Sequence, residues 1–353
     1  MRAFDYRGSS AHILFGSGAR HRVGEALAKL NCKRALVLST PQQAADAKAI
    51  ADELGNSAAG LFTQAAMHTP VAITGRAVEA MREVDADCTL AFGGGSTTGL
   101  GKAIAYRLNT PQIVIPTTYA GSEVTPILGQ TDDGRKETVR TDAVLPEMVI
   151  YDPELTVGLP LAMTVTSGLN AMAHAAEALY ARDRNPISSL MAAEGLRAMA
   201  GSLPRLVQTP GDLSARGEAL YGAWLCGTVL GTVGMSLHHK LCHVLGGSFD
   251  LPHAETHAIV LPHAIAFNAA VAAEELRPII GIFGGDAPGR ALHDFAVRIG
   301  APTALEDIGL RERDIDRAAE IAIAHPYWNP RDFSREDIRT LLGAAWRGDS
   351  PAA

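Results

Sequence analysis

The sequence has no excess of basic residues and no paired cysteines. Its 31 Lys and Arg are outnumbered by 38 Asp and Glu, and the formal net charge is −7 at pH 7. Nucleic-acid binding needs clustered Lys and Arg, so this class of partner is disfavoured, whereas a small anionic substrate is still allowed. The four cysteines are far apart and form no CxxC pair, which is typical of reduced thiols in a cytoplasmic protein.

Long apolar runs are also missing. No segment offers about 18 uninterrupted apolar residues, as a membrane-spanning helix would. The start, MRAFDYRGSS, lacks the apolar core of a signal peptide. We therefore expect no membrane partner. What the chain does have is 47% hydrophobic residues in a length of 353, enough for a sizeable core and, by length, for two domains.

Short apolar, β-rich runs alternate with helix-like segments over the first part of the chain. The predicted strands lie at 11–17, 34–40, 58–63, 88–94, 111–118 and 147–153. Such alternation predicts a Rossmann-like α/β dinucleotide-binding domain, with a parallel sheet that binds ligands at the carboxyl ends of its strands.

After Asp152 the strand signals stop and helical patterns follow one another. These predicted helices lie at 164–182, 186–202, 213–233, 236–247 and 255–272, with shorter ones towards the end. We therefore predict an α/β domain over 1–155, an all-helical catalytic domain over 156–353, and an active site in the cleft between them.

Glycines and hydroxyl residues follow three of the predicted strands. AFGGGSTTGLGKAIA (91–105) places three glycines between a strand and a helix. Such a corner lets a phosphate approach the backbone and the positive end of the helix, although a tight turn alone would explain it as well. IPTTYAGSEVT (115–125) is rich in hydroxyls, and together the two corners suit a dinucleotide diphosphate. VLSTPQQ (37–43) has Ser39 and Thr40 where many NAD-binding domains carry an acidic residue, so NADPH should be rejected only weakly.

Two histidine patterns mark the helical half. SGLNAMAHAAEALYARD (167–183) puts Asn170 and His174 on one helix face. HHKLCHVLGGSFDLPHAETHAIVLPH (238–263) holds six of the twelve histidines, with His239 and His243 one helical turn apart. A lone helical histidine is more often structural, but six in one segment indicate proton transfer or metal binding.

Taken together, GGGS after a strand, an Asn four residues before a His, and HxxxH followed by PH resemble the iron-containing, group III alcohol dehydrogenase superfamily over essentially the whole chain. The resemblance implies an α/β nucleotide domain followed by a helical domain, an architecture shared with the dehydroquinate synthases. It also implies a metal held by one Asp and three His, at positions that here carry Asn170, His174, His239 and His253. Because an amide replaces the only anionic ligand, we expect vestigial positions without a tightly bound metal.

Within the superfamily, the glycine segment, LSTPQQ, SGLNAMAHAAE and HPYWNPRDF (325–333) are similar to those of the maleylacetate reductases. The resemblance implies an oxidoreductase of aromatic-compound degradation that takes hydride from NADH, or from NADPH, and saturates the conjugated C=C bond of maleylacetate, giving 3-oxoadipate. It also implies a homodimer. Loss of the Asp is tolerable in such a reaction, because an enolate can be stabilised by hydrogen-bond donors and a positioned acid instead of a Lewis acid.

The resemblance also suggests roles for individual residues. The expected cofactor contacts are Ser39, Thr40, Gly93, Gly94, Gly95, Ser96, Thr97, Lys102, Thr117, Thr118 and Ser122. The helix position of Lys102 could equally be an exposed turn, and the gap between PTT and GSE is shorter than is usual in the family. The expected catalytic residues are Asn170, His174, His239, His243, His253 and Tyr327, with His243 or Tyr327 as the proton donor. Candidates for binding the substrate carboxylates are Lys136, Arg140, His238 and Arg331, although solvated surface charges are the simpler interpretation.

Three other functions are compatible with parts of this pattern. One is a metal-dependent alcohol dehydrogenase acting on a small aldehyde or ketone, which metal analysis would distinguish. Another is a lyase similar to the dehydroquinate synthases, although the helical half has few basic residues for binding a phosphate. The third is a non-catalytic nucleotide sensor, which would leave so many titratable groups unexplained.

Overall fold

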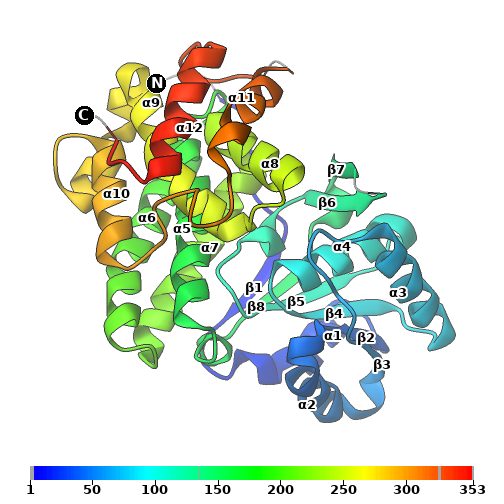
Figure 1. Cartoon of the computed structure of the whole chain (residues 1–353). Helices are drawn as coiled ribbons and strands as arrows, with labels where there is room; N and C mark the ends of the chain where they lie inside the picture. The colour runs from blue at the N-terminus through cyan, green and yellow to red at the C-terminus, as the bar shows by residue number, and fades with distance from the viewer. Residues whose placement is uncertain (1–3, 134, 325–326, 352–353) are drawn as a thin grey trace. The chain divides into compact units, whose positions relative to one another are not determined.

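The computed structural model describes residues 4–133, 135–324 and 327–351, without the side chain of Lys136. The chain divides into two compact units, Gly8–Leu159 and Pro160–Ala353, and the second also includes the N-terminal residues up to Arg7 (Figure 1). The first unit extends a few residues beyond the predicted boundary at 155. The reason is a short helical turn, Pro153–Thr156, whose Thr156 hydroxyl accepts a hydrogen bond from Tyr119 of the same unit at 3.5 Å.

The first unit is built on a six-stranded parallel sheet. The strands are β1 (His12–Phe15), β2 (Ala35–Leu38), β3 (Ala58–Phe62), β4 (Cys88–Gly93), β5 (Gln112–Pro116) and β8 (Met148–Tyr151). Their order is β1-β8-β5-β4-β2-β3, and every neighbouring pair is parallel. Each strand lies within a run that the sequence predicts, so the predicted sheet is confirmed. Strands β5, β4 and β2 are neighbours, which brings the three glycine- or hydroxyl-rich segments to one edge.

Helices cover both faces of this sheet, as the alternation of strands and helices predicts. They are α1 (Val23–Lys29), α2 (Ala44–Leu54), α3 (Val71–Glu83) and α4 (Gly95–Leu108). Helices α1 and α2 pack in one apolar cluster with inward side chains such as Val37 and Leu90. Helices α3 and α4 pack in a second cluster with Leu36 and Ala91, the strand neighbours of those residues. Successive strand residues point to opposite faces, so one buried strand serves both clusters.

A two-stranded antiparallel hairpin is the part of this unit that the sequence did not indicate. It consists of β6 (Ile127–Asp132) and β7 (Arg135–Arg140). The sequence of β7, RKETVR, is almost entirely polar, so it lacks the apolar alternation by which strands are recognised. The Asp-Asp-Gly at the end of β6 was the one available turn signal.

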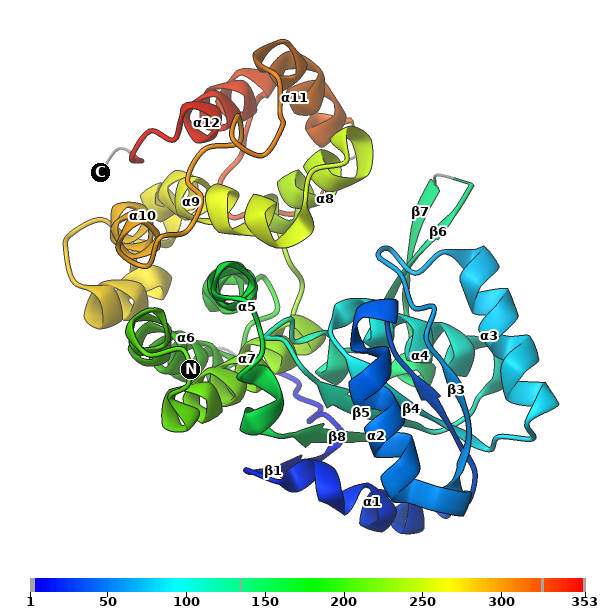
Figure 2. The same ribbon diagram turned by 60° about the horizontal axis from the view of Figure 1, so that its bottom comes forward.

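The described residues of the second unit form helices and connecting loops, with no strand. Its helices are α5 (Leu161–Tyr180), α6 (Pro186–Gln208), α7 (Leu213–Thr232), α8 (Leu237–Phe249), α9 (His253–Phe283), α10 (Pro288–Arg298), α11 (Ile315–Ile323) and α12 (Arg335–Arg347). Helix α5 lies at the centre, in contact with α6, α7 and α9 (Figure 2). Its residues from Thr164 to Tyr180 are all buried, so the polar side chains on it lie in the interior.

Helix α9 is longer than predicted. The predicted end at 272 coincides with Ala272, which has non-helical backbone angles and marks a kink between two helical segments. The stretch His253–Arg298 is also long and apolar enough to cross a membrane by length and composition. However, 67% of its most apolar window is buried within the protein, as expected for a core helix of a globular fold.

Candidate functional site

The corner between β4 and α4 is closed to side chains. Gly93 ends the strand at φ 150°, and Gly94 precedes the first residue of the helix. A Cβ on Gly93 would lie 2.5 Å from Oγ1 of Thr97, and a Cβ on Gly94 would lie 2.9 Å from Cγ2 of Thr118. Gly94 offers no side-chain cap, and the first N–H groups of a helix have no partner within it. Backbone N–H groups and the positive end of α4 therefore form an anion-binding corner.

The predicted cofactor residues of the neighbouring loops meet at this corner. Thr117 donates its N–H to the Gly93 carbonyl at 3.1 Å. Gln43, from the loop after β2, donates to Oγ1 of Thr117 at 2.9 Å and so joins the second and fifth strand ends. The buried hydroxyls of Ser39 and Thr97 have no hydrogen-bond partner in the described part of the chain. Unsatisfied buried hydroxyls beside a glycine cradle fit a dinucleotide. Gln43 is a residue that the sequence analysis missed, although it lies within the quoted VLSTPQQ.

The sequence allows Lys102 either a contact with the cofactor or an exposed position on the helix. The structure instead buries it. It is fully buried, and Nζ donates to the carbonyls of Ser122, Thr125 and Ile127 at 2.6 to 2.8 Å and to Oγ1 of Thr125 at 2.9 Å. Burial lowers the pKa of Lys102 to about 7, while the charge of Glu123 acts to raise it. The predicted direct contact with the cofactor is therefore replaced by a structural role: the ammonium group holds the loop that follows Thr118.

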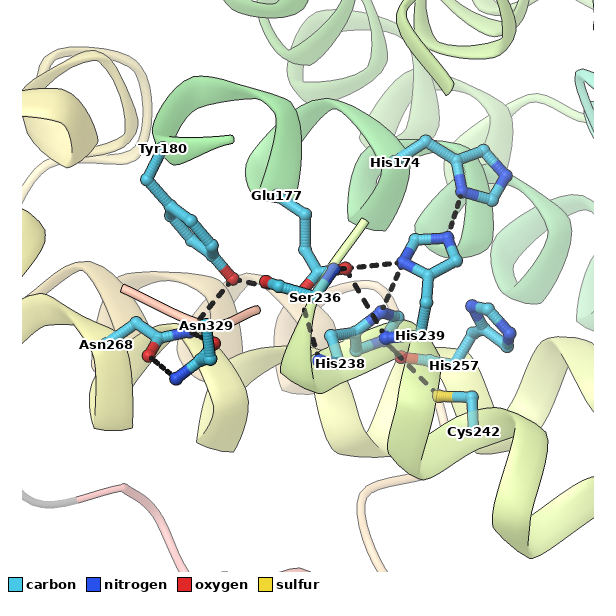
Figure 3. A network of polar contacts seen from close by, with 10 residues as sticks. All are labelled: His174, Glu177, Tyr180, Ser236, His238, His239, Cys242, His257, Asn268 and Asn329. Carbon is cyan, nitrogen blue, oxygen red and sulfur yellow. Dashed lines mark hydrogen bonds and ion pairs between the residues drawn. The ribbon is translucent and has the colours of Figure 1, made fainter. Parts of the chain in front are cut away.

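A second polar cluster lies inside the helical unit, around Glu177 of α5 (Figure 3). Glu177 is fully buried, and Nδ1 of His239 lies 2.6 Å from its Oε2. Nε2 of His239 lies 2.8 Å from Nδ1 of His174. Burial by itself would raise the pKa of Glu177, but the hydrogen bond from His239 holds this pKa far below its ordinary value. The result is a continuous chain from a carboxylate through two imidazoles.

Other histidine rings pack around this pair. The ring centroids of His238 and His257 lie 5.1 and 5.2 Å from that of His239. His238 is completely buried, and its Nε2 lies 3.0 Å from the His257 carbonyl. Burial, together with the neighbouring His239, lowers the pKa of His238 to about 4. It is thus neutral at pH 7 and shielded from solvent, which is a correction to its predicted role in binding a substrate carboxylate.

Of the other four predicted catalytic residues, His243 and His253 lie at the edge of the cluster, and Asn170 is buried one helical turn before His174 on α5. The exposed rings of His243 and His253 have centroids 6.4 Å from His239 and 4.2 Å from His257, respectively. Tyr327 packs on Phe333, with a ring-centroid distance of 5.1 Å. Asn170 is 4% exposed, and its Oδ1 has no hydrogen-bond partner among the described residues. The rings are therefore gathered as the spacing predicts.

Of the other three predicted carboxylate-binding residues, only Arg331 belongs to the helical unit. Arg140 is exposed on β7 of the α/β unit, and the side chain of Lys136 lies outside the described residues, as do 325 and 326 of the HPYWNPRDF motif. Arg331 donates to the Phe267 carbonyl at 3.0 Å and stacks on the Phe267 ring. It lines a cavity of about 1240 Å³ between α9, α10 and α12, and none of the clustered rings is among the residues that line this cavity.

Comparisons with known proteins agree with this architecture. Residues 10–153 match the family model of the iron-containing alcohol dehydrogenases, and residues 164–346 match that of the C-terminal part of the same family. The chain belongs to the iron-containing alcohol dehydrogenase family. The predicted family and fold class are therefore confirmed.

Three full-length relatives narrow this placement within the family. A maleylacetate reductase of Rhizobium sp. (strain MTP-10005) is 60% identical, with 99% of this chain and 100% of the relative covered. One from Burkholderia cepacia is 51% identical, with both chains covered completely. The crystal structure of maleylacetate reductase from Agrobacterium tumefaciens has a TM-score of 0.97 at 60% identity, over 99% of this chain and 100% of that one. This family member thus resembles maleylacetate reductases throughout both units.

The family is named after iron, so the ring cluster can be tested as a metal site. The four positions that correspond to the family's ligands offer three imidazoles and the neutral amide of Asn170. His239 and His174 share a hydrogen at 2.8 Å, so one of these two nitrogens cannot bind a cation at the same time. Glu177, the carboxylate at the cluster, is already engaged by hydrogen-bond donors of Ser236, His238, His239 and Tyr180.

A second combination of rings meets the same obstacle. The ligand nitrogens of His238, His239 and His257 lie within 4.8 Å of one another. The bond from Nε2 of His238 to a carbonyl leaves its Nδ1 available, but both nitrogens of His239 are already engaged, by Glu177 and by His174. Because divalent iron and zinc are held best by sets with anionic ligands or free imidazoles, the donors in this arrangement do not fit a tightly bound ion.

Proposed function

We propose that this protein reduces the conjugated C=C bond of maleylacetate at the expense of NADH or NADPH and releases 3-oxoadipate. The observation that carries the proposal is 60% identity to a maleylacetate reductase over the full length of both chains. The ring cluster with Asn170 at the position of the anionic ligand is consistent with it, since this reduction forms an enolate and does not require a Lewis acid.

The α/β unit holds the cofactor in this proposal. Gly93, Gly94, Gly95 and the first turn of α4 bind the diphosphate, and Thr117 and Thr118 line the adjoining side. When bound, the reduced nicotinamide supplies the hydride. Ser39 and Thr40 at the end of β2 bring no negative charge that would repel a 2′-phosphate, so NADH is favoured over NADPH only modestly.

In this proposal, the helical unit stabilises the enolate of the substrate and donates the proton. Hydride addition at the carbon β to the ketone leaves an enolate, which needs hydrogen-bond donors at its oxygen and then a proton at the α carbon. The exposed rings of His243 and His253 can supply the hydrogen-bond donors and the proton. The buried rings of His174 and His239 lie behind them in the same cluster. That the two units face each other across a cleft stays a prediction. So do the homodimer, the cytoplasmic location and the binding of substrate carboxylates by Lys136 or Arg140.

The test is a direct assay of the purified full-length chain. Loss of NADH absorbance should be fast with maleylacetate and slow with simple aldehydes, and treatment with a chelator followed by dialysis should leave the rate unchanged. Reduction of an aldehyde that depends on stoichiometric iron or zinc would favour the alcohol dehydrogenase alternative. No consumption of NADH with maleylacetate would contradict the proposal.

A further inference from the structure

Glu177 is a buried charge that is not among the site residues predicted from the sequence. It lies on α5 three residues after His174, and its carboxylate accepts hydrogen bonds from two different sets of donors (Figure 3). One set belongs to the beginning of α8, and the other is the ring of His239. Both sets come from a segment about sixty residues later in the chain.

The first set fixes the carboxylate in place. Oε1 accepts from Oγ of Ser236 at 2.8 Å and from the His238 N–H at 2.9 Å, and Oε2 accepts from the Ser236 N–H at 3.1 Å. Ser236 precedes the first residue of α8 and makes no side-chain cap of its own. Glu177 therefore caps α8 from another helix, where the helix dipole and the free N–H groups favour an ionised carboxylate. Tyr180 also donates to Oε1, at 3.0 Å.

The second contact, with His239, determines where the ring hydrogens of two imidazoles lie. An ionised carboxylate can only accept hydrogen bonds, so Nδ1 of His239, at 2.6 Å, carries the hydrogen. In the neutral ring the lone pair is then on Nε2, which lies 2.8 Å from Nδ1 of His174. Nδ1 of His174 must therefore carry the next hydrogen. One carboxylate thus assigns a single tautomer to each of two imidazoles that would otherwise be able to exchange.

We infer that Glu177 is a positioning residue for the reduction: through His239 it sets the tautomer and the orientation of His174. For its effect on turnover this inference rests on the proposed function. In a metal site the ion itself orients the imidazoles, with outer carboxylates in support. In this chain, where the donors do not fit an ion, the carboxylate and the bond between the rings provide the orientation.

The experiment compares Glu177→Gln with Tyr180→Phe in the full-length chain. Gln keeps the shape of Glu but cannot accept hydrogen bonds on both of its terminal atoms, so the His239 ring is no longer held in one tautomer. Phe at position 180 removes a bond to the same carboxylate, namely the bond to Oε1, and leaves the contact between Glu177 and His239 intact. It is thus the matched control for simple loss of packing or stability.

Two readouts are needed. With maleylacetate and NADH, we expect the Gln variant to lose at least about tenfold in kcat with an unchanged KM for NADH, and the Phe variant to remain close to wild type. In ¹⁵N-histidine NMR of the wild type, the His239 signal, assigned by its absence from His239→Gln, should show Nδ1–H as one tautomer. The signal should shift towards a mixture in Glu177→Gln.

An equal loss of kcat in both variants, or none in the folded Gln variant, would overturn the inference. If the Gln variant does not fold, the wild-type spectrum decides: a single Nδ1–H tautomer supports the inference, and an Nε2–H or exchanging ring refutes it. The spectrum requires no substrate, so a failure of the proposed function in the wild-type assay is distinguishable from a failure of this inference.

Discussion

Asn170→Asp tests the conclusion that the site, with an amide at this position, does not bind a metal tightly. The substitution restores the anionic ligand of the family without changing the size of the side chain. We expect the variant to be less stable than the wild type when metal is absent and to gain stability when zinc is added. The wild type should respond to neither condition.

The size of the loss follows from the surroundings of Asn170. The residue is 4% exposed, and its Oδ1 accepts no hydrogen bond from the part of the chain that the structure describes, so an ionised carboxylate there would lose its hydration with no hydrogen bond to replace it. The group can instead take up a proton, which costs about 1.4 kcal/mol for each pH unit above its ordinary pKa of about 3.9. The loss at pH 7 is therefore at most about 4 kcal/mol, or roughly 8–16 °C in Tm for a unit of this size.

The sign of the pH dependence provides an internal check. Burial raises the pKa of the new carboxyl group in the folded state above its unfolded value, so its penalty is small near the unfolded pKa and grows as the pH rises. At pH 5 the loss should be at most about 1.5 kcal/mol. Differential scanning calorimetry at the two pH values, with Asn170→Ala as the uncharged control, measures both quantities.

Zinc provides the second arm of the experiment. At a free concentration 100 times its Kd, zinc bound only to the folded variant should return about 2.7 kcal/mol. If Asn170→Asp is as stable as wild type in a chelator and unchanged by zinc, then position 170 is not part of a latent metal site. If the wild type itself gains stability with zinc and retains the ion after dialysis, the conclusion that its donors do not fit a metal is wrong.

Three further predictions concern other parts of the molecule. Gly94→Ala should weaken NADH binding by roughly tenfold in a fluorescence titration, about 1.4 kcal/mol, because its Cβ would lie 2.9 Å from Cγ2 of Thr118; unchanged affinity would argue against a diphosphate at this corner. Gly289→Ala should lower the free energy of unfolding in urea by about 1–3 kcal/mol, since a Cβ there would lie 2.6 Å from the Pro262 carbonyl of α9; a stability equal to wild type would show that α10 can move freely. Burial lowers the pKa of His263 to about 4, below its ordinary 6.5. The neutral ring carries no penalty above pH 6.5. As the pH falls towards 4, the buried ring resists protonation, and the free energy of unfolding should fall by up to about 3 kcal/mol. Between pH 6.5 and 4, the free energy of unfolding in urea should therefore change less with pH in His263→Gln than in the wild type. An equal change in both proteins would show that His263 does not cause this pH dependence.

Local patterns are sufficient to predict the six strands of the parallel sheet and the glycine corner. Strands β2, β4 and β5 are short apolar runs followed by glycines or hydroxyls, and side-chain period and turn chemistry are properties of neighbouring residues. The hairpin of β6 and β7 is not indicated by the sequence because β7 is almost entirely polar, although Leu128 of β6 packs with Ala103 and Val144. Lys102 was ambiguous because a lysine on a helix is usually exposed, and only the folded loop at 122–127 supplies its acceptors.

In the helical unit the sequence by itself determined which residue types meet, and the tertiary structure decided how they are connected. The spacing of Asn170 and His174 on one helix, and of the histidines on the next segment, already indicated a cluster of imidazoles with an amide in place of an acid. Glu177 stands on the same face of α5, yet its role was invisible because all of its decisive donors come from the start of α8. Whether a buried carboxylate destabilises the fold or holds its neighbours in place depends on donors that are distant in sequence. Only the packing of the helices brings these donors within hydrogen-bond distance.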